Sequence, residues 1–340
     1  MLIYFLLAFL PFCLFFNGSS ASSPRRYWLV CVFIILFTAF RFDVGYDYPA
    51  YWMAISENDD AWIRIYEPGI QLIALLCHEL RSPQLFFFIT STLSLLLILS
   101  SLQLYSSSPK IALLVFLFLF LIIYFGEVRQ AMALSIVFWG FRYVESRSLL
   151  KYLCVCLVAV LFHSSAIFAL LIYFVYKLNF WLVFVIAIAA PVLLMPVFNF
   201  MEQMDMYTTH ISHGEEYKGG NFISIFYVLL YILSLFLIFL KKGNLKNYPS
   251  AKIILATLFL PFFFSPHLSL RIAYYFNIYF CLLIPNILLK QGKNIRFVII
   301  LMLFMYFMLF MYITSLNSSR SPYIPYNMIF WIDEPHFRGI

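Results

Sequence analysis

A dense group of ionisable and aromatic side chains follows the second long apolar run of the chain. The stretch RFDVGYDYPAYW, residues 41–52, contains two aspartates that could accept a proton from a sugar hydroxyl, Asp43 and Asp47. Aromatic faces in the same stretch could pack against sugar rings. These rings belong to Tyr46, Tyr48, Tyr51 and Trp52. The alternative is an aromatic belt at the lipid headgroups, which explains the rings but not the two aspartates.

A second group of candidates opens a later apolar run, in GEVRQAMAL at 126–134. Arg129 falls in the first turn of the expected helix, where exposed backbone amides already favour an anion. A cation there is mildly unfavourable for the helix unless an anion binds. We therefore expect Arg129 to contact an anion, with Gln130 as a neutral donor. The alternative is an ordinary ion pair between Arg129 and Glu127.

Two further stretches carry a histidine and an arginine. In LFHSSAIF, His163 interrupts an apolar run, and we expect it at a hairpin tip where it can act as a general acid or base. The competing interpretation is a buried histidine that only bonds a backbone carbonyl. In SPHLSLRIAYYFN, Arg271 opens another apolar run, and Tyr274 lies on nearly the same helical face one turn later.

The last candidate segment is SPYIPYNMIFW near the C-terminus, which carries Tyr323 and Tyr326. Its prolines favour an extended segment, which we expect to fold back as a lid. The histidines and glutamates at 201–221 have a generic spacing, and the chain has no phosphate-binding loop or dinucleotide glycine pattern. We therefore expect no metal and no cofactor.

The composition indicates what scaffold must position these residues. Of 340 residues, 64% are hydrophobic and only 11% are charged. A soluble domain cannot cover its surface with so few charges, so we expect an all-α polytopic integral membrane protein. No long polar linker interrupts it, which predicts a single transmembrane bundle, residues 1–340, with a cavity on its outer face. The net charge of +7 is scattered over short loops, which argues against a nucleic-acid partner.

The apolar runs predict about 12 transmembrane helices, within a range of about 10–13. Single runs occur at 2–16, 27–40, 84–105, 111–125, 127–142, 180–200, 222–240, 251–265, 272–289 and 297–316. Residues 151–177 are long enough for two short helices folded back at FHSSA. The stretch 69–82 is too short and polar to span, and its polar side chains share one side. This pattern predicts a helix in the membrane interface.

The charges predict an orientation with the N-terminus outside. Every lysine except Lys218 falls in a predicted cytoplasmic loop, as the positive-inside rule requires. Every acidic residue except Glu145, and every histidine, falls outside. Residues 41–83 then form a first periplasmic loop with the interfacial helix, 201–221 a second periplasmic loop, and 317–340 a periplasmic tail.

Most basic residues placed outside are arginines. A guanidinium group binds phosphate oxygens with two parallel hydrogen bonds and keeps its charge near an apolar surface. We therefore predict a phosphate or pyrophosphate site on the outer side. Its residues are Arg41, Arg129, Gln130 and Arg271. For any single arginine the alternative is pairing with a nearby carboxylate, as between Arg64 and Glu67.

Four stretches, in this order and spacing, resemble the EpsG family of bacterial envelope polysaccharide proteins, which is grouped with the Wzy-type O-antigen polymerases. They are RFDVGYDYPAYW, EVRQAMALSIVFWGFRYV, LFHSSAIF and LRIAYYFNIYFCLLIP. The resemblance covers roughly residues 25–290, and the family often has threonine where this chain has Tyr46. It implies a metal-independent glycosyltransferase of the bacterial inner membrane. Such an enzyme joins repeat units carried on undecaprenyl pyrophosphate and has its active site facing the periplasm.

On this resemblance, Arg129 and Arg271, assisted by Arg41, are expected to hold the departing pyrophosphate. The candidates for the base are Asp47, Asp43 and His163. The candidates for sugar binding are Tyr46, Tyr48, Tyr51, Trp52, Tyr274, Tyr323 and Tyr326. The expected partners are undecaprenyl-pyrophosphate-linked O-units, with a chain-length regulator and a flippase in the same membrane.

Three other functions stay open from the sequence. A flippase for the same lipid-linked units would suit twelve spans, but such transporters commonly show repeat symmetry between their halves, and none is visible. An O-antigen ligase would use similar chemistry on a different acceptor. A membrane acyltransferase would use an intramembrane histidine, for which His163 is the candidate.

Overall fold

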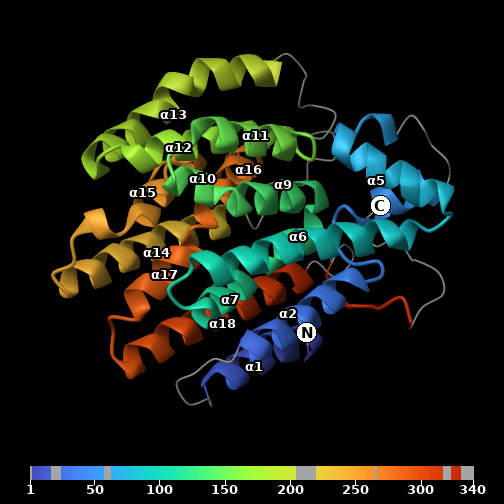
Figure 1. The fold of residues 1–340 in the computed structure, drawn as a ribbon, viewed down its shortest axis with the longest axis horizontal. Helices are drawn as coiled ribbons and strands as arrows, with labels where there is room; N and C mark the ends of the chain where they lie inside the picture. Colours follow the sequence, from blue (N-terminus) through green and yellow to red (C-terminus); the bar gives the residue numbers. More distant parts are fainter. Residues whose placement is uncertain are drawn as a thin grey trace.

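The computed structural model describes residues 2–16, 24–56, 63–203, 220–264, 266–316 and 323–330. These residues form a bundle of helices that run broadly alongside one another (Figure 1). The only extended pairing among them is an isolated bridge between Arg41 and Met328. The predicted all-helical class is confirmed.

Each predicted apolar run forms one helix or a series of shorter ones. The unbroken helices are α1 (Leu2–Phe16), α2 (Pro24–Ala39), α6 (Pro83–Tyr105), α13 (Phe180–Gln203), α14 (Gly220–Leu240) and α18 (Lys293–Leu316). The broken pairs are α7 (Pro109–Leu119) with α8 (Leu121–Gly126), α9 (Val128–Trp139) with α10 (Phe141–Glu145), and α16 (Pro266–Asn277) with α17 (Phe280–Leu288). The predicted hairpin at 151–177 consists of α11 (Leu149–Val160), η1 (Ser164–Ala169) and α12 (Leu170–Lys177). The run at 251–265 gives α15 (Pro249–Leu255), flanked by the turns η3 (Leu245–Asn247) and η4 (Leu260–Phe262).

Two more helices lie in the predicted first periplasmic loop, α3 (Tyr48–Ser56) and α5 (Pro68–Glu79). The second of these is the helix predicted at 69–82. Proline sets the start of several helices, because its missing N–H is not needed in a first turn. The helices that begin on proline are α2, α5, α6, α7, α15 and α16.

Length and composition support a membrane protein. Within the described residues, three helices are long and apolar enough to cross a bilayer, Pro83–Tyr105, Phe222–Leu240 and Lys293–Ser315. The pair α16 and α17, bent by 42°, would make a fourth if it forms one span. Several shorter apolar helices accompany them. The predicted number of spans is larger, because many of the predicted runs form helices of fewer than 18 residues and breaks near Phe120, Gly140 and Ile278 divide three of the runs.

The core has two parts. The larger one follows the length of the bundle and is built mainly of leucine, isoleucine, phenylalanine and tyrosine. The smaller one joins α3 and α5 to the neighbouring end of α6, with Tyr48, Tyr51, Ile70, Phe86 and Phe87 at its centre. In Figure 1, α5 and this end of α6 lie together at one end of the bundle. The smaller core therefore fixes the predicted first periplasmic loop onto the bundle.

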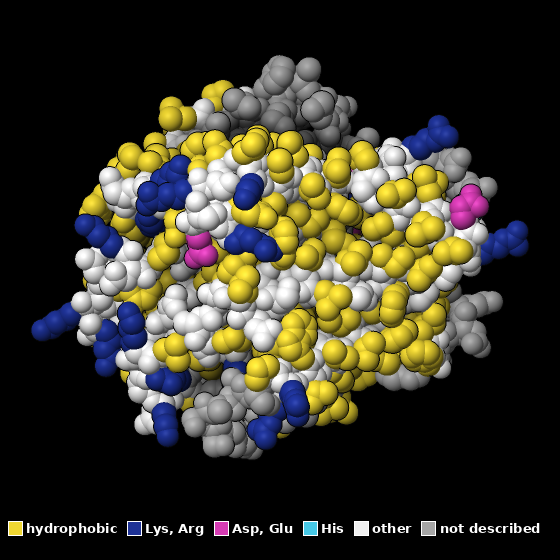
Figure 2. Space-filling view, viewed as in Figure 1, with side chains coloured by type: hydrophobic (Ala, Val, Ile, Leu, Met, Phe, Trp, Pro, Cys, Tyr) yellow, Lys and Arg dark blue, Asp and Glu magenta, His cyan; other side chains and the backbone are white. Residues whose placement is uncertain are grey.

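The surface is largely apolar. Figure 2 shows a broad expanse of hydrophobic side chains across the middle of this face, and most of its basic side chains lie on the half away from α5. Most of the predicted second periplasmic loop, residues 204–219, and the last part of the tail, residues 331–340, fall outside the described residues.

Candidate functional site

The charged candidates meet at the end of the bundle where α5 lies and α9 begins (Figure 1). There α9 packs against α6, α11 and α16, and η1 packs against both α9 and α16. Helix starts, short connections and the segment 40–47 bring together residues that are far apart in the sequence.

Arg41 anchors the segment 40–47 to the bundle. It is fully buried, and its guanidinium group stacks over the Phe87 ring at 5.2 Å. Its Nε–H donates to the Val44 carbonyl at 3.1 Å, while NH1 donates to the Thr38 carbonyl at 2.8 Å and to Ser91 Oγ at 2.6 Å. Burial lowers the pKa of Arg41 to about 10. The side chain thus holds the backbone of its own segment, and its predicted contact with a pyrophosphate stays a prediction.

The turn after Arg41 approaches the end of α8 closely. Gly45 has a φ of +114°, and a Cβ there would lie 1.9 Å from the Phe125 carbonyl oxygen, so only glycine fits. This approach lets the Asp47 N–H donate to the Gly126 carbonyl at 3.2 Å. The Asp47 carboxylate in turn accepts from the Val128 N–H at 3.2 Å. Asp47 therefore caps the start of α9 from a distant segment.

A second carboxyl group, that of Glu127, lies in the connection between α8 and α9. Burial raises its pKa to about 7; the charge of Asp47 adds to the rise, and that of Arg271 opposes it. Burial likewise raises the pKa of Asp47, although Arg129 and Arg271 lower it. Glu127 Oε2 has no hydrogen-bond partner among the described residues. These two carboxyl groups retain protons more readily than ordinary ones.

Glu67 links three other parts of the site. One carboxylate oxygen accepts from Arg129 NH1 at 2.9 Å. The other lies 3.2 Å from His163 Nδ1 and accepts from the Ser164 N–H at 3.1 Å. Burial alone would raise its pKa, but the bond to His163 and the charge of Arg129 outweigh burial and hold it at about 2. Glu67 is therefore ionised at neutral pH.

This arrangement corrects the predicted pairings of the arginines. The carboxylate bonded to Arg129 is Glu67, which lies 62 residues earlier in the sequence, and not its neighbour Glu127. The sequence suggests Glu67 only as a partner for Arg64. Its position directly before Pro68 and Gly69, at the start of a helix, is the one feature that distinguishes it, and this feature is too weak to indicate a role in the site.

His163 lies in the turn between α11 and η1 and is buried, with 6% of its surface exposed. Burial lowers its pKa, and the bond with Glu67 opposes this shift. Its Nε2 is buried without a hydrogen-bond partner among the described residues. The histidine therefore does not take the competing role of a side chain that only bonds a backbone carbonyl.

Gln130 ties α9 to α16, since its Nε2 donates to the Arg271 carbonyl at 2.6 Å. The Arg271 side chain stays partly exposed, and in the described part of the chain no carboxylate lies within ion-pair distance of it. Its charge acts on Asp47, Glu127 and His163. The positive charges of Arg129 and Arg271 therefore act on the same residues, Asp47 and His163.

The predicted sugar-binding aromatics are mostly packed in the core. Tyr48 and Tyr51 stack on Phe87 and Phe86, with ring centroids 4.0 and 4.6 Å apart. Tyr46 is the exception, with half of its surface exposed. Trp52 is partly buried, and Tyr274, Tyr323 and Tyr326 are buried. Sugar contact by this set stays a prediction, and Tyr46 is its most accessible member.

Asp43 and the tail residues 323–330 both pack with the segment 40–47. Asp43 is buried, and its charge acts on Tyr48. Residues 323–330 fold back onto this segment, with the Phe42 N–H donating to the Asn327 carbonyl at 3.0 Å and the Ile329 N–H to the Phe40 carbonyl at 3.2 Å. The predicted fold-back is present, and movement of the tail as a lid stays a prediction.

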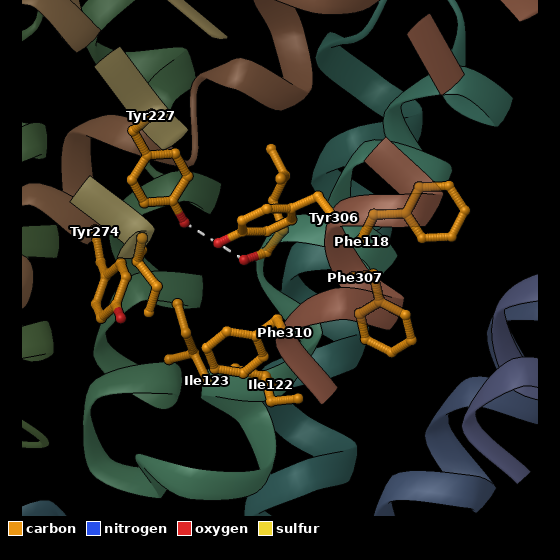
Figure 3. A pocket seen from close by; sticks show the side chains of 10 residues that line it. Phe118, Ile122, Ile123, Tyr227, Tyr274, Tyr306, Phe307 and Phe310 are labelled. Atoms are coloured by element: carbon orange, nitrogen blue, oxygen red, sulfur yellow. Dashed lines mark hydrogen bonds between the residues drawn. The ribbon is translucent and has the colours of Figure 1, made fainter. Parts of the chain in front are cut away.

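An apolar pocket lies nearby, among α7, α8, α14, α16 and α18 (Figure 3). Phe118, Tyr227, Tyr306 and Phe310 contribute aromatic rings to its wall. Tyr274 also lines it, one helical turn after Arg271, and Ile123 lines it one turn before Glu127. The pocket thus adjoins the charged group on two helices.

No group of three histidine, cysteine or acidic side chains that could hold a metal ion occurs among the described residues. The histidines and glutamates of the 201–221 stretch lie outside them, except for Glu202 in the last turn of α13.

An all-helical, strongly apolar bundle with such a charged group at one end defines a multi-pass membrane protein with a polar site. More specifically, the chain belongs to the EpsG family, whose profile matches residues 26–328. The family consists of polysaccharide polymerase-like membrane proteins. The match reaches residue 328 and therefore includes Asn327, whose carbonyl accepts from the Phe42 N–H. No curated protein and no solved structure matches the chain.

Proposed function

We propose that this protein is an O-antigen polymerase of the bacterial inner membrane. It joins oligosaccharide repeat units carried on undecaprenyl pyrophosphate, at the periplasmic face, without a metal or cofactor. The family supports a polymerase-like role. The observation that carries the finer proposal is the group in which Arg129 and Arg271 act on the same carboxyl group, Asp47, beside the histidine that is bonded to Glu67.

The proposed reaction is a glycosyl transfer between two lipid-linked sugars. A hydroxyl oxygen of the acceptor unit attacks the anomeric carbon of the growing chain, and the bond from that carbon to the pyrophosphate oxygen breaks. The hydroxyl proton passes to a base, and undecaprenyl pyrophosphate leaves with the electron pair. Because the leaving group is already an anion, it needs positive charge more than a proton.

The two arginines suit this need differently. Arg271 has no carboxylate within ion-pair distance in the described part of the chain, so its fork can take two phosphate oxygens. Arg129 shares its charge with Glu67 through one nitrogen and keeps other N–H groups for a ligand. Both side chains are partly exposed, which a site for an incoming lipid headgroup requires.

The apolar pocket supports the same substrate. Its aromatic and aliphatic wall includes Tyr274, one helical turn after Arg271, and Ile123, one turn before Glu127, and such a wall suits the prenyl chain of a lipid whose pyrophosphate is held at the charged group. In this proposal the prenyl chain leaves the charged group along α16 and α8 into the lipid.

The proposed placement in the membrane follows the charges. Twelve spans, with breaks inside several of them, would put the charged group below a cavity on the outer face. The exposed leucines of α5, Leu72, Leu75 and Leu76, suit a helix lying in the outer interface. The basic side chains gathered away from α5 in Figure 2 suit a cytoplasmic end. A flippase and a chain-length regulator in the same membrane would supply units and limit the product.

The test is a lipopolysaccharide gel of a deletion strain that carries the gene, the Arg271→Ala variant or the Arg129→Ala variant. Either variant is expected to leave only single repeat units on the lipid core, because the leaving group loses its charge partner. Arg64→Ala, at an exposed arginine before α5, is the matched control and keeps long chains. Long chains of normal length in both variants would refute the proposal.

The deletion strain itself separates the other functions. Single capped units indicate a lost polymerase, and complete absence of O-units on the core indicates a lost ligase. Units stranded on the cytoplasmic face indicate a lost flippase. Either of the last two results would overturn the proposed function.

A further inference from the structure

We infer that His163 is the general base of this transfer and that Glu67 positions it, so that His163 Nε2 is the unprotonated nitrogen that takes the proton of the acceptor hydroxyl. The inference rests on the proposed function, which leaves three residues open as the base. It is drawn from the hydrogen bonds of Glu67, which fix where the ring carries its proton.

The donors around Glu67 determine the tautomer of His163. Arg129 and the Ser164 N–H can only donate, and both bond to the Glu67 carboxylate, at 2.9 and 3.1 Å. An ionised carboxylate can only accept. The ring nitrogen 3.2 Å from the same carboxylate, Nδ1, must therefore carry the hydrogen. In a neutral ring the proton is then absent from Nε2.

The other ring nitrogen is left ready to accept. His163 Nε2 is buried and has no hydrogen-bond partner among the described residues. A buried acceptor without a partner is costly, so it is expected where a ligand supplies the missing donor. Two more buried acceptor atoms in the same group lack a partner, Glu127 Oε2 and Gln130 Oε1. A ligand rich in hydroxyl donors, such as a sugar, matches this set of acceptors.

The two aspartates are less suited to be the base. Asp47 already accepts the Val128 N–H and so holds the start of α9. It is also the carboxyl group on which the charges of Arg129 and Arg271 both act, so that it serves as a counter-charge for the two arginines although burial raises its pKa. Asp43 is buried beside Tyr48, in the part of the segment that Arg41 anchors. Its position assigns it to the packing of that segment.

Burial is the main reason that the His163 ring is neutral at neutral pH. Burial lowers its pKa, and the charges of Arg129 and Arg271 act in the same direction, while the bond to Glu67 raises it. The titratable groups that face it from neighbouring elements are Glu67, Asp47, Arg129, Arg271 and, through Ser165, Tyr275. Because the lowering effects prevail, the ring can act as a base at the pH of the periplasm.

The first measurement reads the tautomer without using activity. Protein labelled with nitrogen-15 histidine is studied by NMR in detergent, and His163→Gln identifies the His163 signals among the six histidines. A neutral ring with the proton on Nδ1 is expected at pH 7. A proton on Nε2, or a doubly protonated ring, would overturn the inference.

The second measurement follows elongation of purified lipid-linked repeat units against pH. His163→Gln is expected to lower the rate roughly 10²- to 10⁴-fold, the range typical of a lost general base. Glu67→Gln can give only one acceptor oxygen to donors on two sides, so the proton of the ring is no longer held on Nδ1. In the Glu67→Gln protein the acidic limb of the pH–rate profile should move to lower pH, because the carboxylate that raises the pKa of His163 is gone.

Two further variants complete the test. Glu67→Asp keeps the charge, so it should keep the proton on Nδ1 and recover part of the rate. Glu79→Gln removes an exposed carboxylate at the end of α5 and should change neither the tautomer nor the pH profile. A Glu67→Gln protein that loses activity with an unmoved acidic limb would show a merely structural role and overturn the inference. Wild-type protein that does not elongate the units would refute the proposed function, and the base assignment with it, while the tautomer would still test the geometry.

Discussion

Replacing Gly45 with alanine should displace the segment that carries Asp47. A Cβ on Gly45 would lie 1.9 Å from the Phe125 carbonyl oxygen, and such contacts do not occur below 3.0 Å, so one backbone must move by about 1.1 Å. The φ of +114° adds strain of roughly 1–3 kcal/mol for a residue with a side chain. A misplacement of about 1 Å can cost roughly 10²-fold in rate. We therefore expect the Gly45→Ala protein to elongate chains about 100-fold more slowly.

The assay is elongation of purified lipid-linked repeat units, with the amount of folded protein measured by size exclusion and thermal unfolding. Gly292→Ala is the matched control, because a Cβ there meets nothing within 4 Å. It makes the same chemical change at an open position in the turn before α18. Its rate should equal that of the wild type.

The reasoning fails if the Gly45→Ala protein is folded and fully active, since the segment would then not position the site. It also fails if Gly292→Ala loses the same activity, because the effect would not depend on the close approach to Phe125. A folded Gly45→Ala protein with a lower melting temperature and a low rate is the expected outcome.

Three further predictions concern stability, pH and metals. Gln84→Leu removes the hydrogen bonds that the amide makes to Tyr48 and to the Arg41 carbonyl, and should lower the free energy of unfolding by roughly 1–3 kcal/mol, measured by thermal unfolding. The folded pKa of Glu67, about 2, lies below its ordinary value of 4.5, so its interactions with His163 and Arg129 stabilise the protein above about pH 4.5, and this stabilisation is lost as the pH falls toward 2. The melting temperature should therefore fall over this range in the wild type and less in Glu67→Gln; parallel curves would contradict the assignment. Elongation should persist in excess EDTA, and loss of activity that added Mg²⁺ or Mn²⁺ restores would contradict a metal-independent reaction.

The helices could be predicted because apolar runs leave few alternatives. A run such as 84–105 has no charged residue, and it forms the single helix α6 almost to the residue. Breaks inside the runs were not predictable from hydropathy. Gly140 lies between α9 and α10, at a point where a Cβ would come within 2.6 Å of Val155 of α11, and hydropathy does not reveal that neighbour.

The charged site was predicted in part. Arg129, Arg271 and His163 could be singled out because a polar residue at the start of an apolar helix is costly and therefore conspicuous. Glu67 could not, because its partners lie 62 and 96 residues away and nothing local indicates them. Arg41 was conspicuous for the same reason as Arg129, yet it bonds to two nearby backbone carbonyls, those of Thr38 and Val44, and to Ser91 of α6.

The aromatic residues show a different limit. Tyrosine suits both a sugar site and a protein core, because one end of its ring is apolar and the other can donate a hydrogen bond. Tyr48 uses its hydroxyl on Gln84 and its face on Phe87, which no pattern in RFDVGYDYPAYW reveals. Spacing alone cannot distinguish the half-exposed Tyr46 from its buried neighbours.

The bridge between Arg41 and Met328 bears on the order in which the protein matures. Tyr326 also donates to the Phe37 carbonyl, a partner 289 positions earlier, so the segment that leads to Asp47 gains this support only after that length of chain has been made. A nascent chain that has not yet reached Tyr326 and Met328 therefore still lacks their contacts with Phe37 and Arg41. Truncations ending before Tyr323 would remove these contacts, whereas removal of the residues after Phe330 would keep every one of them.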